Sequence, residues 1–462
     1  MLKSKYSDGF FSIDKENGFL PLAEPLRQLP EAYTDLQTLI DHMPIEREDG
    51  SKGLLHTEGA FEKAVLQIEN HLEQVKTEKD PFVRAALFRA YSFVCSAYTL
   101  APAHHHFIAN GTYGKAHRTV PKNIAQPFAE VADQLGQFPF LDYHYSYSLG
   151  NYYKIDPDGG FDWENLGMAA KFSGMSDERG FIMLHVDINQ YSPQLIEGSM
   201  GIVHAQDDEE MNHHLKLVGT ALKHMNARRR LMWEASRWKH YNDFRVFIMG
   251  VKGNTDIFDE GLIYEGVWDE PKAFRGQTGA QDNIIPTADI ISGVVDFYPE
   301  NQLTQYLMDL RQYRPVCVQD FLKDLKESST GSAGTIARLK ASNNQKGLQL
   351  LLKVLEEIYL FRNGHWQFVQ KYIMSNTAYP KATGGTPITS WIPNQIKAVL
   401  SAMTTVDQLT EDGAHGFDKN EWKVGFEKKV QLLNKQLEIV QVPSFNPEDV
   451  FKLNAALGLN DA

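Results

Sequence analysis

Cysteine is scarce in this sequence, with only Cys95 and Cys317 among 462 residues. Neither belongs to a C-x-x-C pair or to another spacing typical of metal ligands, and two residues cannot build a disulfide framework. Both follow a valine, Val94 and Val316, which favours packing in the core, the commoner fate of a free cysteine. The sequence therefore points away from small disulfide-rich folds and cysteine-ligated zinc sites.

Long apolar runs and a surplus of basic residues are also missing. The longest apolar runs, such as 180–184, are far shorter than the roughly 20 residues that a membrane-spanning helix needs. The start of the chain lacks the apolar core of a signal peptide, so we expect a cytoplasmic protein without a membrane partner. With 46 Lys and Arg against 59 Asp and Glu, the net charge is −13. Nucleic acid is therefore not an expected partner.

Several common catalytic motifs are absent as well. The sequence contains no H-E-x-x-H, G-x-S-x-G or P-loop pattern. These absences exclude the usual zinc protease, serine hydrolase and nucleotide hydrolase interpretations.

Helical periodicity dominates what is present, and we predict a mainly α fold. We expect a smaller N-terminal domain of mixed or helical structure, residues 1–160, and a large helical domain, residues 161–462, with a C-terminal extension from about residue 390. Apolar spacing predicts helices at about 61–72, 81–100, 189–200, 207–238, 280–298, 301–313, 347–374 and 417–440. Residues 101–162 are expected to be irregular with short helices. The best strand signals, 181–186 and 244–250, are equally consistent with buried helix.

A histidine lies on the apolar face of the helix predicted near residues 349–372. Its apolar positions Leu355, Ile358 and Phe361 lead to His365 at helical spacing. A histidine on such a face is commonly a hydrogen-bonded core residue, but a haem iron would also use one of its nitrogens. Arg362, one turn earlier on the same side, could then pair with a haem propionate.

Two further features have both a structural and a functional interpretation. Arg245 lies in the otherwise apolar segment 243–250, where it forms either a buried structural ion pair or a carboxylate-binding site. The Gly-centred segment 383–386 is either a flexible turn or a loop whose backbone N–H groups face an anion.

Several segments in order along the chain resemble the indoleamine 2,3-dioxygenase family. The longest is 261–276, following Val-Lys-Gly-Asn at 251–254. Shorter matching segments are 18–21, 120–127, 306–313, 361–365 and 383–386. Together they extend from about Gly18 to Ile388.

The resemblance implies a b-type haem protein with a helical large domain that inserts O₂ into an indole amino acid such as L-tryptophan. It would also need an electron donor that keeps the iron ferrous. His365 falls where the family carries its axial haem ligand, and Arg362 where a propionate contact is expected. The resemblance also assigns four substrate-binding residues: Arg245 to the carboxylate, Thr383 to the ammonium, and Phe181 and Tyr143 to the indole pocket.

Departures from the family pattern fall at the distal side of the expected haem. Residues 276–282 read Gly-Gln-Thr-Gly-Ala-Gln-Asp where the family usually has Gly-Gly-Ser-Ala-Gly-Gln-Ser. Thr278 keeps a hydroxyl there, whereas Gln277 adds bulk. His185 stands where a familiar member has a small serine. It could accept the indole N–H, as a distal histidine does in the related tryptophan 2,3-dioxygenases, or it could hydrogen-bond O₂. His185 and Thr278 are therefore the catalytic candidates. The alternative is that His185 is a buried structural histidine.

Three functions remain open on these grounds. The first is a dioxygenase that cleaves the indole C2–C3 bond to an N-formylkynurenine-type product. The second is a haem-dependent monooxygenase of an indole or other aromatic amino acid in a biosynthetic pathway, and the third is a non-catalytic haem-binding protein.

Overall fold

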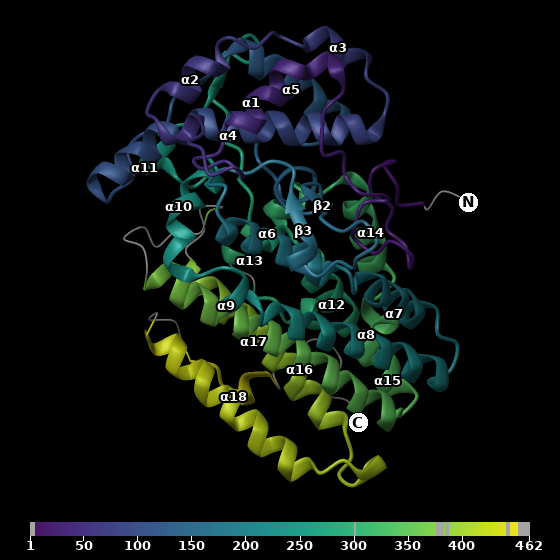
Figure 1. Ribbon diagram of the computed structural model, residues 1–462. Helices are drawn as coiled ribbons and strands as arrows, with labels where there is room; N and C mark the ends of the chain where they lie inside the picture. Colours follow the sequence, from purple (N-terminus) through teal and green to yellow (C-terminus); the bar gives the residue numbers. More distant parts are fainter. Residues whose placement is uncertain (1–4, 300–301, 376–382, 384–387, 440–443, 451–462) are drawn as a thin grey trace.

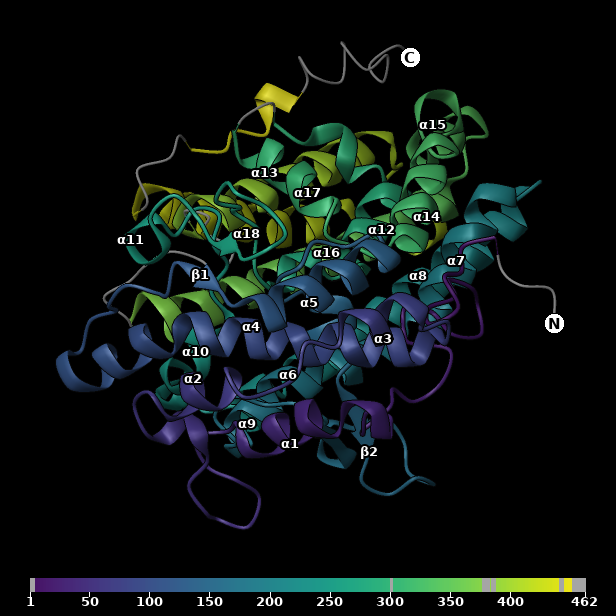
Figure 2. The same ribbon diagram turned by 90° about the horizontal axis from the view of Figure 1, so that it is seen from above.

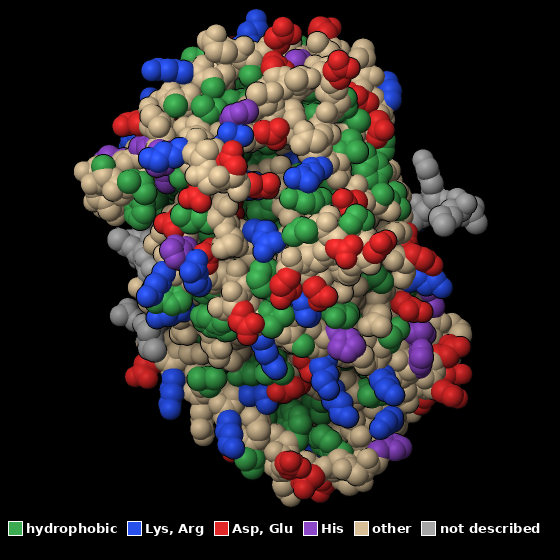
Figure 3. Space-filling view, in the orientation of Figure 1, with side chains coloured by type: hydrophobic (Ala, Val, Ile, Leu, Met, Phe, Trp, Pro, Cys, Tyr) green, Lys and Arg blue, Asp and Glu red, His purple; other side chains and the backbone are tan. Residues whose placement is uncertain are grey.

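Helices account for 63% of the computed structural model and strands for 5%, which confirms the predicted mainly α fold. The structure describes residues 5–299, 302–375, 383, 388–439 and 444–450. Gly384, Gly385 and Thr386 of the predicted Gly-centred loop lie outside these residues. Acidic and basic side chains are interspersed over the face shown in Figure 3. No helix in the described ranges is long and apolar enough to cross a membrane.

The N-terminal part is organised around α4, Pro81–Asn110, which runs across the molecule in both views (Figures 1 and 2). Asp80 caps its start by accepting a hydrogen bond from the backbone N–H of Phe82 at 2.8 Å, and Gly111 ends it in a left-handed conformation. The predicted end at residue 100 was therefore wrong by ten residues. Pro102 and the three histidines after it suggested a break, but buried alanines on either side of Pro102 keep that turn packed in the core.

Shorter helices and strands surround α4 in this part. They are α1 (Thr34–His42), α2 (Ala60–Val65), α3 (Leu72–Thr77), α5 (Lys122–Leu135), β1 (Thr119–Val120), β2 (Tyr152–Lys154) and β3 (Leu166–Met168). The single helix predicted at 61–72 is thus two helices. Asp35 fixes the break between them, because its carboxylate accepts hydrogen bonds from the backbone of Glu69 at 2.8 Å and the ring of His71 at 2.7 Å.

The larger part is a stack of long helices in which α16 lies between α8 and α17, while α18 packs on α17 at the outer edge (Figure 1). The helices are α6 (Ser176–Asn189), α7 (Ser192–His204), α8 (Asp208–Arg229), α9 (Met232–Ala235), α10 (Tyr241–Arg245), α11 (Thr255–Phe258), α12 (Ile284–Ser292), α13 (Gln302–Arg311), α14 (Val316–Glu327), α15 (Thr335–Ala341), α16 (Gln345–Phe368), α17 (Ile388–Leu409) and α18 (Lys419–Ile439). Buried apolar side chains from both sides of residue 160 form one continuous core, and the domain boundary there stays a prediction.

Both candidate strands are helical, as their alternative interpretation allowed. Residues 181–186 belong to α6, and 244–250 form the end of α10 followed by a short 3₁₀ turn. The strands within the described residues are two small pairs, β1 with β4 (Ile263–Tyr264) in parallel and β2 with β3 antiparallel. Continuous apolar runs do not distinguish a buried helix from a buried strand, which is why periodicity left the choice open.

A single carboxylate fixes the start of α6. Glu178 is completely buried and accepts hydrogen bonds from the backbone N–H groups of Phe172 at 2.9 Å and Ser173 at 2.7 Å. The hydroxyls of Ser173 and Tyr147 donate to the same carboxylate at 2.7 and 3.3 Å. A negative charge near a helix N-terminus also interacts favourably with the helix dipole. Glu178 therefore ties α6 to segments on both sides of the core.

We expect Glu178→Ala to lower the free energy of unfolding by about 3 kcal/mol, because it leaves several buried donors without an acceptor. Urea unfolding followed by circular dichroism measures the loss. Glu164→Ala, which removes an exposed carboxylate before the same helix, is the matched control and should change stability by less than about 0.5 kcal/mol. Equal losses in the two variants would show that Glu178 does not anchor α6.

Candidate functional site

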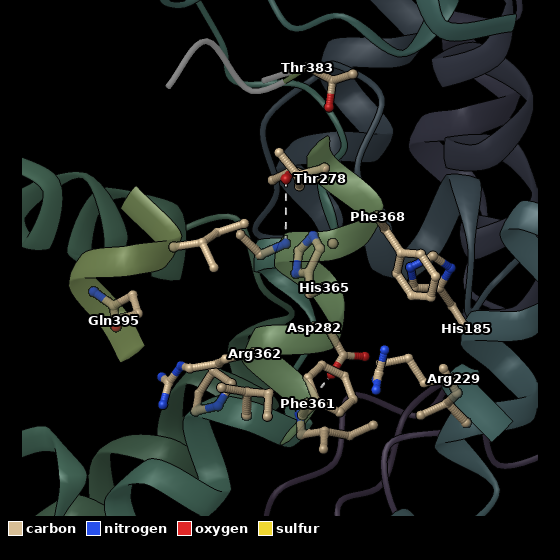
Figure 4. A pocket seen from close by; sticks show the side chains of 18 of the residues that line it. His185, Arg229, Thr278, Asp282, Phe361, Arg362, His365, Phe368, Thr383 and Gln395 are labelled. Carbon is tan, nitrogen blue, oxygen red and sulfur yellow. Dashed lines mark hydrogen bonds between the residues drawn. The ribbon is translucent and has the colours of Figure 1, made fainter. Parts of the chain in front are cut away.

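A largely apolar cavity lies between α6, α12, α16 and the loop at 277–282 (Figure 4). Six of the eight residues predicted for the site line it: Phe181, His185, Thr278, Arg362, His365 and Thr383. Its other walls include Ile188, Tyr241, Ile284, Phe361, Phe368, Val369 and Ile373. The structure thus brings together residues that are as much as 202 positions apart in the sequence, Phe181 and Thr383.

His365 faces this cavity from the last turns of α16. Burial, together with the nearby Arg229 and His185, lowers the pKa of its imidazole to about 4. The ring is therefore neutral at physiological pH. No other described residue forms a hydrogen bond with it. A neutral imidazole whose nitrogens are not used by the protein fits an axial haem ligand, and the apolar walls fit a porphyrin.

Arg362 is engaged in an ion pair at the edge of the cavity. Its guanidinium binds Asp289 with two hydrogen bonds, one of them 2.9 Å between Nη1 and Oδ1, and the Tyr298 hydroxyl donates to the same carboxylate. Asp289 is completely buried. Arg311 lines the cavity as well. The predicted propionate contact of Arg362 would therefore be made by a guanidinium that already has a carboxylate partner.

Arg229, at the end of α8, is a site residue that the sequence analysis did not identify. Its side chain lines the cavity but is only 7% exposed, and it contacts Asn226 and the carbonyl of Leu360 rather than any described carboxylate. Its guanidinium lies 5.6 and 5.5 Å from the ring centroids of Phe361 and Phe368. Burial lowers its pKa to about 10, which still leaves it charged at neutral pH. The sequence does contain a signal that Arg229 is buried, because Arg229 continues the apolar stripe of α8. This stripe comprises Met211, Leu215, Val218, Leu222 and Met225.

Arg229 also explains the glycine beside His365. A methyl group on Gly364 would lie only 2.1 Å from Nη1 of Arg229. The guanidinium therefore occupies the space that any larger side chain at position 364 would need.

His185 approaches the cavity from α6, on a different element from His365 (Figure 4). Its Nδ1 is 3.0 Å from the carbonyl of Phe181, so the proton lies on Nδ1 and Nε2 is an acceptor in the neutral ring. A methyl group built on Gly279 would be 3.7 Å from this Nε2, which places the nitrogen beside the loop. Burial lowers the pKa of His185, although Asp282 acts in the opposite direction.

The loop at 276–282 is held by close backbone packing. Gly276 lies against Gly250 so tightly that a methyl group on Gly250 would be 1.9 Å from the backbone nitrogen of Gly276. The Thr278 hydroxyl accepts a hydrogen bond from the N–H of Ala280, which caps a short 3₁₀ turn. Thr383 donates to the carbonyl of Gln277 at 3.0 Å, so it contacts the same loop.

The two other predicted substrate residues do not line the cavity. Tyr143 is buried behind it and donates a hydrogen bond to Asp282 at 2.7 Å, with its ring 5.7 Å from that of His185. Arg245 is completely buried and hydrogen-bonds Tyr241, whose ring does line the cavity. Tyr143, expected to wall the indole pocket, and Arg245, expected to bind the substrate carboxylate, thus each contact a residue that lines the cavity rather than lining it themselves.

Comparison with known proteins identifies the family of this chain. Residues 8–413 match the family model described as indoleamine 2,3-dioxygenase. Indoleamine 2,3-dioxygenase 1 of Rattus norvegicus is 26% identical over 326 residues, which cover 69% of this chain and 74% of the relative. A 6-hydroxytryptophan 2,3-dioxygenase of Fusarium equiseti is 24% identical over 79% of this chain and 84% of its own length. A myoglobin of Haliotis madaka is 28% identical over 40% of this chain and 47% of its own length.

The contact between Gly364 and Arg229 predicts that Gly364→Ala changes the free energy of unfolding in opposite directions depending on whether Arg229 is present. Gly364→Ala alone should destabilise the protein by about 1–2 kcal/mol, because the methyl group displaces a buried guanidinium. In an Arg229→Ala background the same change should stabilise it by about 0.5–1 kcal/mol, the usual gain of alanine over glycine inside a helix. Urea unfolding of the four proteins measures both effects, and an equal effect in the two backgrounds would contradict the contact.

Proposed function

Because the chain belongs to the indoleamine 2,3-dioxygenase family, we propose that it is a haem b-dependent dioxygenase that cleaves the C2–C3 bond of L-tryptophan or a closely related indole amino acid. The observation that carries the proposal is the pairing of His365 and His185 around one apolar cavity, the first with an unused neutral ring and the second with an acceptor nitrogen. The product would be of the N-formylkynurenine type.

We assign the haem to the cavity, where the imidazole of His365 would hold its iron. When bound, the ferrous haem supplies the oxygen chemistry, and an electron donor keeps it ferrous. Arg362 would bind a propionate at the cavity edge while Asp289 holds its guanidinium in place. The buried charge of Arg229 lies close enough to His365 to disfavour protonation of the imidazole, so it helps to keep that ring neutral and available to the metal.

Substrate orientation is assigned to the residues opposite His365. Phe181 would pack on the indole, with Tyr143 supporting the wall from behind through Asp282. Arg245 would bind the carboxylate of the amino acid, which requires Tyr241 to share or yield its hydrogen bond. Thr383 would contact the ammonium, and Thr278 would offer its hydroxyl from the loop. Holding the ring and the amino-acid group at once restricts the substrate to one orientation, and this lowers the entropic part of the barrier.

Turnover under ¹⁸O₂ tests the proposal directly. The haem-loaded protein, supplied with a reductant and L-tryptophan, should give a formylkynurenine-type product that carries two labelled oxygen atoms. One labelled atom would identify a monooxygenase instead, and stable O₂ binding without product would identify a non-catalytic haem protein. His365→Ala should lose stoichiometric haem, measured by the Soret absorbance, while its far-ultraviolet circular dichroism stays unchanged.

The proposed role of His185 predicts how the enzyme responds to 1-methyltryptophan. Methylation removes the indole N–H donor and adds bulk, so 1-methyltryptophan should bind poorly to the wild type. His185→Ser should bind it better while turning over tryptophan more slowly. Activity of the wild type should fall at acidic pH only below the usual histidine pKa of about 6.5, because the acceptor must be neutral and burial lowers its pKa.

A structural role for His185 has a different signature. His185→Ser would then lose thermal stability but keep the same selectivity between tryptophan and 1-methyltryptophan. That pattern would remove His185 from the mechanism.

A further inference from the structure

Three hydrogen-bond acceptors on residues that line the cavity can each take a further hydrogen bond. They belong to His185, Asn189 and Asp282, which we call the acceptor cluster. His185 and Asn189 lie one helical turn apart on α6, and Asp282 reaches the same region from the end of the loop at 276–282. Figure 4 shows His185 and Asp282 projecting into the cavity from these separate elements.

Every donor in the acceptor cluster is already used inside the protein. The amide nitrogen of Asn189 donates to the carbonyl of His185 and to Oδ2 of Asp282, both at 2.9 Å. The Nδ1 proton of His185 is used by the carbonyl of Phe181, and the hydroxyl of Tyr143 is used by Asp282. Both neighbours of the Asn189 amide nitrogen are acceptors, so the orientation of that amide follows from the network.

The acceptors, by contrast, have lone pairs that no hydrogen bond uses. Oδ1 of Asn189 is buried without a hydrogen-bond partner among the described residues, and Asn189 itself is only 1% exposed. Asp282 receives one hydrogen bond on Oδ1, from the backbone of Ile284 at 2.8 Å, which leaves that oxygen a further lone pair. Nε2 of His185 is the third acceptor. A ligand group that occupies this region must therefore be a hydrogen-bond donor.

We propose that the acceptor cluster recognises a hydroxyl group on the benzene ring of the substrate, at carbon 6 or 7 of the indole. The inference rests on the proposed function, in which His185 accepts the indole N–H. Carbons 6 and 7 lie on the same side of the indole as that N–H, and Asn189 lies about 6 Å further along the helix axis than His185. A hydroxyl at either carbon would donate to Asn189 or Asp282, and a bond to the carboxylate is charge-assisted. A hydroxyl at carbon 5 points away from this side of the ring.

Binding of a matched set of ligands tests the inference without requiring turnover. The haem-loaded protein is titrated with L-tryptophan and with its 5-, 6- and 7-hydroxy derivatives, and dissociation constants are obtained from the haem absorption spectrum and by calorimetry. We expect the 6- or the 7-hydroxy compound to bind about tenfold more tightly than tryptophan, and the 5-hydroxy compound to show no such gain. Equal or weaker binding of both the 6- and 7-hydroxy compounds would overturn the inference.

Variants locate the preference in the acceptor cluster. Asp282→Asn and Asn189→Leu should each abolish the gain from the hydroxyl, measured on each variant as the ratio of its dissociation constants for tryptophan and for the hydroxy compound. Gln190→Leu, at the residue that follows the end of α6 and lies outside the cavity, is the matched control and should keep the gain. A gain that persists in both cluster variants would place recognition elsewhere. If Asn189→Leu does not fold, Asp282→Asn and the wild-type series decide.

The two proposals fail in distinguishable ways. Turnover of tryptophan to a doubly labelled product without any preference for hydroxylated ligands would overturn only the acceptor-cluster inference. A clear preference for the 6- or 7-hydroxy compound with no oxygenated product would support the inference about binding and overturn the proposed dioxygenase activity.

Discussion

The buried carboxylate of Glu178 is the interaction on which the arrangement of the cavity depends. It joins α6 to the segment at 172–174 and to Tyr147, and α6 in turn carries Phe181, His185 and Asn189 at intervals of four residues. This spacing places the three side chains on one face of the helix, on successive turns. A displacement of the helix start would therefore move the aromatic wall and two polar groups of the site together.

Several charged side chains around the cavity are buried, and removing a charge from water costs free energy unless it is paired or hydrogen-bonded. Each of the buried charges below has specific partners. Arg362 and Asp289 compensate each other at one edge. Arg314, only 2% exposed, holds the loop from behind by donating to the side chain of Asn283 at 2.9 Å and to the carbonyl of Asp282 at 3.0 Å. Burial lowers the pKa of Arg314 to about 9. The loop is thus held by a buried cation as well as by the packing of Gly276 on Gly250.

The fold class could be predicted from the sequence because it depends on local apolar spacing, and six of the eight site residues expected from the family resemblance line the cavity. Apolar spacing predicted helices where α8 and α16 lie, and the family resemblance assigned Phe181, His185, Thr278, Arg362, His365 and Thr383 to one site. Predictions failed where tertiary contacts override local signals, as in the continuation of α4 past Pro102 and the break between α2 and α3 at Asp35.

The partners of the site residues could not be predicted, because they come from distant segments. Nothing in the local sequence indicates that Arg362 pairs with Asp289, or that Tyr143 reaches Asp282 rather than the cavity itself. Arg229 was overlooked because a run of three arginines at a helix end is usually a solvated, dipole-compensating group. Only the heptad-like stripe of α8 distinguishes the buried arginine from its two neighbours.

The contact between Arg229 and Gly364 has an evolutionary consequence. The two positions belong to different helices, yet the guanidinium fills the space that a side chain at 364 would need. A side chain at 364 therefore conflicts with an arginine at 229, so we expect the pair to co-vary among homologues: an arginine on α8 with glycine at 364, and a smaller or apolar residue on α8 where a larger side chain stands at 364. A lineage would have to pass through glycine at 364 before it could acquire the buried charge.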